Sequence, residues 1–482
     1  MQVLEYSDLV RNRCYIGGEW VSGDQQMAVY NPATNKILAH VPKLGAKETT
    51  AAINAANAAG IGWRALTGKE RSVVLRRWHD LIMANIDTLA RIVTEEMGKP
   101  FSEAKGEILY GAGYIEWFAE EAKRVYGDVI PGHQSDKRLI VIKQPVGVVG
   151  AITPWNFPSA MLARKLAPAL AAGCTIVAKP AESTPLSALA LALLGEKAGI
   201  PKGVINIVTG DPIAIGKELT NNPLVRKLSF TGSTAVGRML LRQSADTVKR
   251  VSMELGGNAP FIVFDDADLD SAVEGALNSK YRNAGQTCVC TNRFYIQDGI
   301  YEQFLGKLKA HVEAMKVGNG FDEGVQQGPL INEMAIRKVE TLIRDAVEKG
   351  AQVVSGGQRH ALGGTFYAPT LLRDVTPKMR IATEEIFGPV AAVFRFSSEA
   401  EVIHQANDSE YGLASYFYTK DVGRAWRVAE AIEAGMVGIN TGLISTEVAP
   451  FGGIKQSGSG REGSRHGIDD YLELKYVCFG DI

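Results

Sequence analysis

Short apolar runs alternate with helical patterns along most of this chain, and this alternation restricts its fold more than any other feature. Residues 225–230 form a candidate strand, residues 231–234 a Gly/Ser/Thr turn, and residues from 235 onward a helical pattern. A second unit places a β-branched strand at 173–179 before a helix at 187–198. Because strands joined through a helix run parallel in the same sheet, repeated units of this kind predict an α/β fold with a parallel, doubly wound sheet.

The chain has 482 residues, which is too many for a single hydrophobic core, so we expect two or three domains. The character of the sequence changes at residues 260–266, where a second α/β series begins and continues to about residue 445. Amphipathic helices are expected at 47–63 and 70–97.

Composition excludes several classes of protein. The net charge is −1, so the totals predict neither a nucleic-acid nor a membrane partner. No basic and apolar leader is evident, and the absence of a paired cysteine framework is typical of a cytoplasmic protein. The seven histidines lack metal-ligand spacing, so we expect no metal site. The five cysteines are Cys14, Cys174, Cys288, Cys290 and Cys478.

Cys288 is the first candidate for chemistry, in the run Arg-Asn-Ala-Gly-Gln-Thr-Cys-Val-Cys at 282–290. A nucleophilic thiol reacts as the thiolate and needs a base to serve its intermediate. Glu254 lies beside two glycines, where the backbone can approach a ligand closely. The alternative is that Cys288 is a small core residue.

Five further motifs accompany this pair and appear in one order along the chain. The two segments Glu-Leu-Gly-Gly-Asn and Gly-Gln-Thr-Cys resemble the signatures of the aldehyde dehydrogenase superfamily, and the likeness covers nearly the whole sequence. The signatures occupy 254–258 and 285–288, and the other motifs occupy 153–158, 179–182, 230–237, 385–389 and 450–453.

The resemblance implies the aldehyde dehydrogenase fold, with a Rossmann-like cofactor domain, an α/β catalytic domain and a β-strand oligomerisation arm. The cofactor domain would take residues 1–124 and 145–254, and the catalytic domain residues 255–450. The arm would take residues 125–144 and 460–482. An exposed strand edge calls for a partner strand, so a homodimer or homotetramer is expected.

The family's catalytic residues fall on three positions. The resemblance implies that Cys288 attacks the aldehyde carbon to form a thiohemiacetal, and that Glu254 activates the water that hydrolyses the thioester. The side-chain amide of Asn156, with the Cys288 backbone N–H, would stabilise the charge on oxygen. The alternatives are a turn residue at Asn156 and a buried, paired carboxylate at Glu254.

The resemblance also implies a dinucleotide cofactor, NAD, with NADP possible. The turn that precedes a helix at 231–237 would face the pyrophosphate. Glu182 can accept hydrogen bonds from ribose hydroxyls but repels a 2′-phosphate, so we expect a preference for NAD, although Lys179 lies nearby. The residues assigned to the cofactor are Thr153, Trp155, Lys179, Glu182, Gly232, Ser233, Leu255 and Glu385.

Three residues indicate the class of aldehyde. Arg164, eight positions after Asn156 on the same expected helix, Arg282 and Ser445 match the branch of the family that acts on succinate semialdehyde. Unpaired guanidinium groups are costly in an apolar pocket but suit a substrate that brings its own anion. The resemblance therefore implies oxidation of a short ω-carboxy aldehyde, most directly succinate semialdehyde to succinate. The partner would be this small anionic aldehyde, with no membrane and no nucleic acid.

Several alternatives stay open at this point. Either arginine could pair structurally with a protein carboxylate, and glutarate semialdehyde or sulfolactaldehyde would suit the same basic pocket. An acylating enzyme that uses coenzyme A, or a non-enzymatic structural relative, would retain the fold. Finally, relatives can close a disulfide between the loop cysteines, so Cys290 is a candidate redox switch for Cys288.

Overall fold

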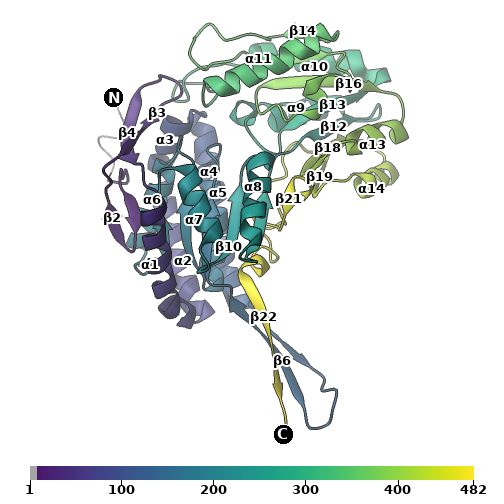
Figure 1. Cartoon of the computed structure of the whole chain (residues 1–482). Coiled ribbons are helices and arrows are strands. Elements are labelled where there is room, and N and C mark those ends of the chain that lie inside the picture. Colours follow the sequence, from purple (N-terminus) through teal and green to yellow (C-terminus); the bar gives the residue numbers. More distant parts are fainter. Residues whose placement is uncertain (1–7, 482) are drawn as a thin grey trace.

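The computed structural model describes residues 8–481, which form two large sheets with their helices and a projecting arm (Figure 1). The N-terminal half builds one body, the green and yellow-green segments build a second, and β6 and the yellow β22 extend away from both. Residues 1–7 and 482, which the predicted ranges 1–124 and 460–482 include, lie outside the described residues. The division of the chain into those domain ranges stays a prediction.

The first sheet has a parallel centre. Strands β9, β8, β7, β10 and β11 run parallel, while β1 and β21 pair antiparallel at its two sides. The strand order, with bounds, is β2 (Glu19–Val21), β1 (Cys14–Ile16), β9 (Ile205–Ile207), β8 (Thr175–Lys179), β7 (Val148–Ile152), β10 (Val225–Thr231), β11 (Arg250–Glu254) and β21 (Gly458–Ser459).

The second sheet is parallel except at its first strand, β14. Its order is β14 (Gln352–Ser355), β15 (Thr370–Arg373), β16 (Val390–Phe396), β13 (Thr291–Gln297), β12 (Ala259–Val263), β18 (Ala414–Tyr418) and β19 (Met436–Ile439). The parallel α/β architecture predicted from the alternating pattern is therefore confirmed in both bodies.

The arm is a three-stranded antiparallel sheet that joins distant parts of the chain. Strand β6 (Arg138–Pro145) lies between β5 (Asp128–Ile130) and the C-terminal β22 (Leu472–Phe479). Large apolar side chains point outward from it, with Val129 83%, Leu474 68% and Tyr476 59% exposed. Two further pairs, β3 (Gln26–Tyr30) with β4 (Ile37–Pro42) and β17 (Tyr411–Gly412) with β20 (Ile454–Lys455), complete the strands.

The helices of the first body are α1 (Ala46–Ala65), α2 (Gly68–Ala84), α3 (Ile86–Met97), α4 (Phe101–Glu121), α5 (Ala160–Ala172), α6 (Leu186–Lys197), α7 (Pro212–Asn221) and α8 (Thr234–Ala245). Those of the second are α9 (Leu269–Lys280), α10 (Tyr301–Ala314), α11 (Glu333–Glu348), α12 (Arg380–Thr383), α13 (Glu399–Asn407) and α14 (Val422–Ala431). Across residues 8–481, no helix is long and apolar enough to cross a membrane.

The expectation of one helix over 70–97 is wrong. The backbone leaves helical geometry at Asn85, which ends α2 and begins α3. The side-chain amide of Asn85 donates to the carbonyl of Leu81 at 2.7 Å, so it satisfies a carbonyl that a continuing helix would have bonded through its backbone.

The two sheets present opposite ends to a common region. Ile152 and Lys179 end neighbouring parallel strands in register, and Ile152 also pairs with Phe230, the residue before the end of β10. On the next strand, Glu254 pairs with Thr231, the last residue of β10. The second sheet contributes its amino ends, because the segments that precede β12 and β13 contain the two signatures. Side chains from both signatures are thereby brought together between the bodies.

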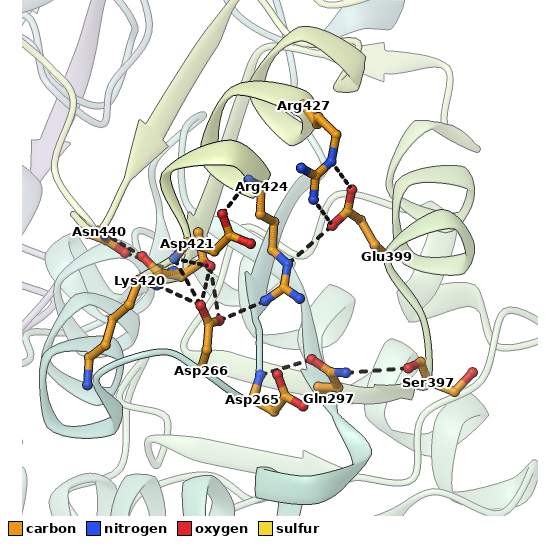
Figure 2. A network of polar contacts seen from close by, with 11 residues as sticks. Asp265, Asp266, Gln297, Ser397, Glu399, Lys420, Asp421, Arg424, Arg427 and Asn440 are labelled. Atoms are coloured by element: carbon orange, nitrogen blue, oxygen red, sulfur yellow. Dashed lines mark hydrogen bonds and ion pairs between the residues drawn. The ribbon is translucent and has the colours of Figure 1, made fainter.

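The carboxyl edge of the second sheet is closed by a polar network around Asp266 (Figure 2). Its carboxylate accepts hydrogen bonds from the Thr419 hydroxyl, from the backbone N–H groups of Lys420 and Asp421, and from Arg424 at 2.8 Å. Burial raises the pKa of Asp266, but these hydrogen bonds outweigh burial and lower it. A side-chain carboxylate thus occupies the start of α14, where a parallel α/β unit often binds an external anion.

We expect Asp266→Ala to lower the free energy of unfolding by about 1–3 kcal/mol, because it leaves several N–H groups without their acceptor. The folded-state pKa is depressed, so this stabilisation is present above the unfolded pKa near 4 and is lost as the pH falls below it. Thermal unfolding followed by circular dichroism from pH 7 down to about pH 2 measures both effects.

The matched control is Asp265→Ala, since Asp265 is exposed and only its backbone N–H makes a hydrogen bond. Equal losses of stability in the two variants would contradict a specific role for the Asp266 carboxylate.

Candidate active site

A cavity of about 590 Å³ lies between the two bodies and contains most of the predicted site residues. The predicted residues that line it are Cys288, Asn156, Trp155, Gly232, Ser233, Leu255, Glu385, Arg164, Arg282 and Ser445. Those that do not are Thr153, Lys179, Glu182, Glu254 and Cys290. Sequence reasoning missed the contributions of α4 and α11, including Tyr110 and Lys338, because no motif distinguishes those positions.

Cys288 follows a strained turn. Asn283, Ala284 and Gly285 all have positive φ, at 54°, 55° and 74°. A Cβ at Gly285 would lie 2.1 Å from the carbonyl oxygen of Gly388, so only glycine fits there. Consecutive left-handed residues persist only where their surroundings hold them, which is typical of functional sites.

Side-chain amides fix this turn. The Asn283 amide donates to the backbone carbonyls of Asn156 and Gln286, at 3.1 and 3.2 Å. The Gln286 amide donates to Asn283 O and accepts from Ile331 N. The turn is therefore joined both to the segment before α5 and to the segment before α11, and Cys288 has a defined position.

The Cys288 thiol is partly exposed to the cavity but lies among apolar groups. Burial raises its pKa to about 12. The guanidinium of Arg164 opposes this shift, and the carboxylate of Glu254 adds to it. Without bound ligands the thiol form is thus strongly favoured at neutral pH.

Asn156 lies in the loop before α5, so the expectation that it shares a helix with Arg164 is wrong. Its side-chain amide donates to the Gln286 carbonyl at 3.0 Å. An amide nitrogen carries two protons, so this bond orients the group and leaves one N–H for another acceptor. The Asn156 side chain lines the same cavity as Cys288.

A buried ion pair supports the loop that contains Asn156. Lys99 donates to Glu107 at 2.6 Å and to the Asn156 carbonyl at 2.8 Å, and both charged side chains are fully buried. Glu107 also accepts from the backbone N–H groups of Ser159 and Ala160 at the start of α5. No local pattern in the sequence predicts this pair, because its members act through contacts with other segments.

Glu254 is buried behind the cavity lining, with 4% of its surface exposed. Neither carboxyl oxygen has a hydrogen-bond partner among residues 8–481. Burial raises the pKa of Glu254 well above its usual value, and the nearby carboxylate of Glu462 raises it further. Both effects stabilise the neutral acid relative to the carboxylate, compared with an exposed glutamate.

Glu462 is the main electrostatic residue that sequence reasoning missed. Its carboxylate lies 2.6 Å from the Arg164 guanidinium and 2.7 Å from the Lys165 ammonium, all three groups being buried. Burial raises the pKa of Glu462, but the two cations outweigh burial and lower it. The sequence does contain one indication of this pairing: two adjacent cations lie in the apolar stretch 160–178. Because buried charges need a counter-ion, they indicate that a carboxylate from elsewhere in the chain packs against them.

The two arginines of the cavity differ in whether a protein carboxylate pairs with their positive charge. Arg164 forms an ion pair with Glu462, which agrees with the alternative that this arginine pairs with a protein carboxylate, and it also lines the cavity. The Arg282 guanidinium forms no hydrogen bond or ion pair within the described range and lies 5.5 Å from the ring centre of Phe157. Ser445 faces the same cavity. Among the described residues, the positive charge of Arg282 is therefore the arginine charge of the cavity that is not held in an ion pair.

The opposite part of the cavity has features suited to a dinucleotide. Ser233 caps the N-terminus of α8, where unpaired backbone N–H groups favour an anion. Glu385 accepts from Gly257 N at 3.0 Å, and burial raises its pKa. Gly237 leaves room for Leu255, since a Cβ there would lie 2.4 Å from a Leu255 methyl carbon.

The remaining predicted residues lie outside the cavity lining. Lys179 is buried and forms an ion pair with the half-exposed Glu182, while Thr153 N donates to the Lys179 carbonyl at 3.1 Å. Cys290 is buried, and its thiol donates to the Lys280 carbonyl at 3.6 Å. Both Cys288 and Cys290 are free thiols. No cluster of metal-ligating side chains occurs among the described residues.

Comparison with known proteins gives matches along the whole chain. The model of the aldehyde dehydrogenase family matches residues 20–477. The glutarate-semialdehyde dehydrogenase of Pseudomonas aeruginosa is 64% identical over 99% of this chain and 100% of its own length. The succinate-semialdehyde dehydrogenase [NADP(+)] of Escherichia coli is 63% identical over 99% of each chain. The 3-sulfolactaldehyde dehydrogenase of Pseudomonas putida is 60% identical over 100% of each.

Solved structures agree with this likeness. An NADP-dependent enzyme of E. coli superimposes with a TM-score of 0.98 at 62% identity, covering 98% of this chain and 99% of the other. The betaine aldehyde dehydrogenase of Staphylococcus aureus in complex with NAD+ gives 0.97 at 36% identity, covering 99% and 97%.

We expect alkylation of Cys288 by iodoacetamide, in protein without cofactor, to accelerate about tenfold per pH unit between pH 7 and pH 9. The reason is that the thiolate reacts and the raised pKa keeps its fraction small throughout this range. Mass spectrometry of the Cys288 peptide measures the rate, and the buried Cys290 in the same peptide serves as an internal reference. A rate that stops increasing with pH before pH 8 is reached would contradict the raised pKa.

Proposed function

Because this chain belongs to the aldehyde dehydrogenase family, we propose that it oxidises a short aldehyde with a terminal anion, in the first place succinate semialdehyde, to the corresponding acid. The observation that carries the proposal is the Arg282 guanidinium, which lines the cavity and forms no ion pair among residues 8–481, although the Glu103 carboxyl interacts with it electrostatically. A partly buried cation without an ion-pair partner is stabilised when the substrate supplies a carboxylate.

The names of the relatives support this class of substrate. Glutarate semialdehyde, succinate semialdehyde and 3-sulfolactaldehyde are short aldehydes with a carboxylate or sulfonate at the other end. The shared chemistry is an aldehyde and an anion separated by a few carbons. Chain length and the type of anion distinguish the three, so they are the alternatives to test.

Catalysis would begin at Cys288. Its thiolate adds to the aldehyde carbon, so that the carbonyl oxygen takes the negative charge of a tetrahedral thiohemiacetal. The free N–H of the Asn156 amide and the backbone N–H of Cys288 would donate to this oxygen. The contact between the Asn156 amide and Gln286 O supports this role because it orients the donor before substrate arrives.

The cofactor would occupy the part of the cavity beside α8. Members of the family use NAD(P), whose oxidised nicotinamide supplies the hydride acceptor when bound. Ser233 and Gly232 would contact the pyrophosphate, Leu255 and Trp155 the nicotinamide region, and Glu385 a ribose. Thr153, Lys179 and Glu182 would bind the adenosine side, and the Glu182 carboxylate favours NAD over NADP.

Hydrolysis of the acyl-enzyme would depend on Glu254. The carboxylate form is the base that accepts a proton from the attacking water. Since burial and Glu462 raise the pKa of Glu254, the fraction of carboxylate at a given pH is smaller than for an exposed glutamate and increases as the pH rises. Because no group of residues 8–481 forms a hydrogen bond with its oxygens, the side chain is free to approach water in the cavity.

Two further assignments complete the proposal. Oxidation would join Cys288 and Cys290 in a disulfide, which removes the nucleophile reversibly. The exposed apolar side chains of the arm would pair with a second copy, giving a homodimer or homotetramer.

Arg282→Gln tests the substrate class. We expect kcat/KM for succinate semialdehyde to fall roughly 10²–10³-fold, because the substrate carboxylate loses its free guanidinium, while butanal changes about twofold or less. Initial rates of NADH or NADPH formation, measured for succinate semialdehyde, glutarate semialdehyde, 3-sulfolactaldehyde and butanal with each cofactor, also rank the alternatives.

Arg344→Gln is the matched control, since Arg344 is exposed on α11. Equal kcat/KM of the wild-type enzyme for butanal and for the anionic aldehydes would contradict the proposal.

Glu254→Gln tests the hydrolytic role. We expect a rapid burst of NADH equal to about one per active site, followed by turnover reduced about 10²-fold or more, because acylation proceeds and hydrolysis lacks its base. Stopped-flow absorbance measures both phases. If the burst is lost as well, Glu254 serves chiefly as the base for the Cys288 thiol.

A further inference from the structure

One face of α4 lines the cavity on the substrate side. Glu103, Gly106, Glu107 and Tyr110 recur at helical spacing and all contribute to the lining. Glu107 is committed to Lys99, and Glu103 accepts from the Asn283 N–H at 2.8 Å. The Tyr110 hydroxyl is the group on this face whose proton is not committed to a charged partner.

The Tyr110 hydroxyl belongs to a chain of hydrogen bonds. Its oxygen lies 3.1 Å from the Tyr114 hydroxyl oxygen, and either phenol can be the donor. Tyr114 in turn donates to the carbonyl of Thr446 at 3.4 Å, which is long for an O–H···O bond. Thr446 follows Ser445, so the chain connects α4 to the loop that carries a predicted substrate residue.

Each phenol has a single proton, which gives the chain two arrangements. In the first, Tyr114 donates to Thr446 O and Tyr110 donates to Tyr114. In the second, Tyr114 donates to Tyr110, and Tyr110 donates into the cavity. Only the weak 3.4 Å bond is given up in the change, so an acceptor in the cavity would favour the second arrangement.

Tyr110 lies near the cationic side of the cavity. Burial lowers the pKa of the Arg164 guanidinium, and the carboxylate of Glu462 more than restores it. Tyr110 and Arg164 both line the same cavity. The Arg164 guanidinium also lies 5.4 Å from the ring centre of Tyr114.

The neighbouring glycine keeps this region open. A Cβ added at Gly106, one turn before Tyr110, would meet no atom within 4 Å. A substrate chain can therefore extend past this position and reach the phenol. A bulkier residue at 106 would occupy that space.

We propose that Tyr110 is a substrate-specificity residue, whose hydroxyl donates a hydrogen bond to the terminal anion of the aldehyde. In that arrangement the Tyr114 hydroxyl donates to the Tyr110 oxygen instead of the Thr446 carbonyl. The inference rests on the proposed function. Arg164 is already compensated by Glu462, so Arg282 alone cannot satisfy the several acceptor sites of a carboxylate or sulfonate. Tyr110 and Ser445 supply neutral donors, which add hydrogen bonds without adding buried charge.

The test is Tyr110→Phe in the complete enzyme with saturating NAD. We expect kcat/KM for succinate semialdehyde to fall roughly 10- to 100-fold, the effect of one hydrogen bond to a charged group, while butanal changes about twofold or less. Most of the loss should lie in KM, since the contact is made equally in the ground state and the transition state.

Two companion variants sharpen the result. Tyr114→Phe keeps the phenol that contacts substrate, so its loss for succinate semialdehyde should be smaller than that of Tyr110→Phe. Tyr126→Phe, 72% exposed on the segment before β5, is the matched control and should match the wild type.

The outcomes separate this inference from the proposed function. Equal losses for succinate semialdehyde and butanal in Tyr110→Phe, or no loss for either, overturn the inference alone if the wild type still prefers the anionic aldehyde. A wild type without that preference overturns the proposed function, and the inference with it.

Discussion

The active site depends first on the carboxylate of Glu462, because it compensates two cations buried on α5. Arg164 and Lys165 are 1% and 0% exposed, and every residue of this helix is buried. A buried cation without a partner is strongly destabilising, so α5 can occupy its place only when the segment that follows β21 packs against it. The same carboxylate raises the pKa of Glu254. A contact required for folding therefore also sets the proton affinity of the proposed base.

The two sheets differ in what their edges can bind. The first presents the carboxyl ends of its strands and the open N-terminus of α8 to the cavity, an arrangement suited to a dinucleotide. The second presents its amino ends there, and its carboxyl edge is filled by the Asp266 carboxylate and its partners. The Asp266 carboxylate thus occupies the position at which an α/β sheet often binds an anionic ligand. Both signatures therefore act at a single cavity between the bodies, although each body is built from similar strand–helix units.

The proposed selection of an anionic aldehyde rests on the charge that remains in the cavity after internal pairing. The two arginines of the cavity look equivalent in the sequence, but Glu462 pairs with Arg164 and no described residue pairs with Arg282. One free positive charge is enough to attract a carboxylate and avoids the larger cost of two uncompensated charges in an apolar region. Hydroxyl groups such as that of Tyr110 can complete the binding site, since they donate hydrogen bonds without further desolvation of charge.

The sequence alone determined the α/β architecture, the strands of the arm, the family, and ten of the residues that line the cavity. These follow from local periodicity and from motifs that are contiguous in the chain. It did not predict the break at Asn85, where one side-chain hydrogen bond interrupts a continuous helical pattern. Nor did it predict the pairing of Arg164 with Glu462, separated by almost 300 residues, or the contribution of Tyr110. Only the tertiary structure decides such features, because the free energy of a buried charge or hydroxyl depends on which distant groups packing brings within hydrogen-bond distance.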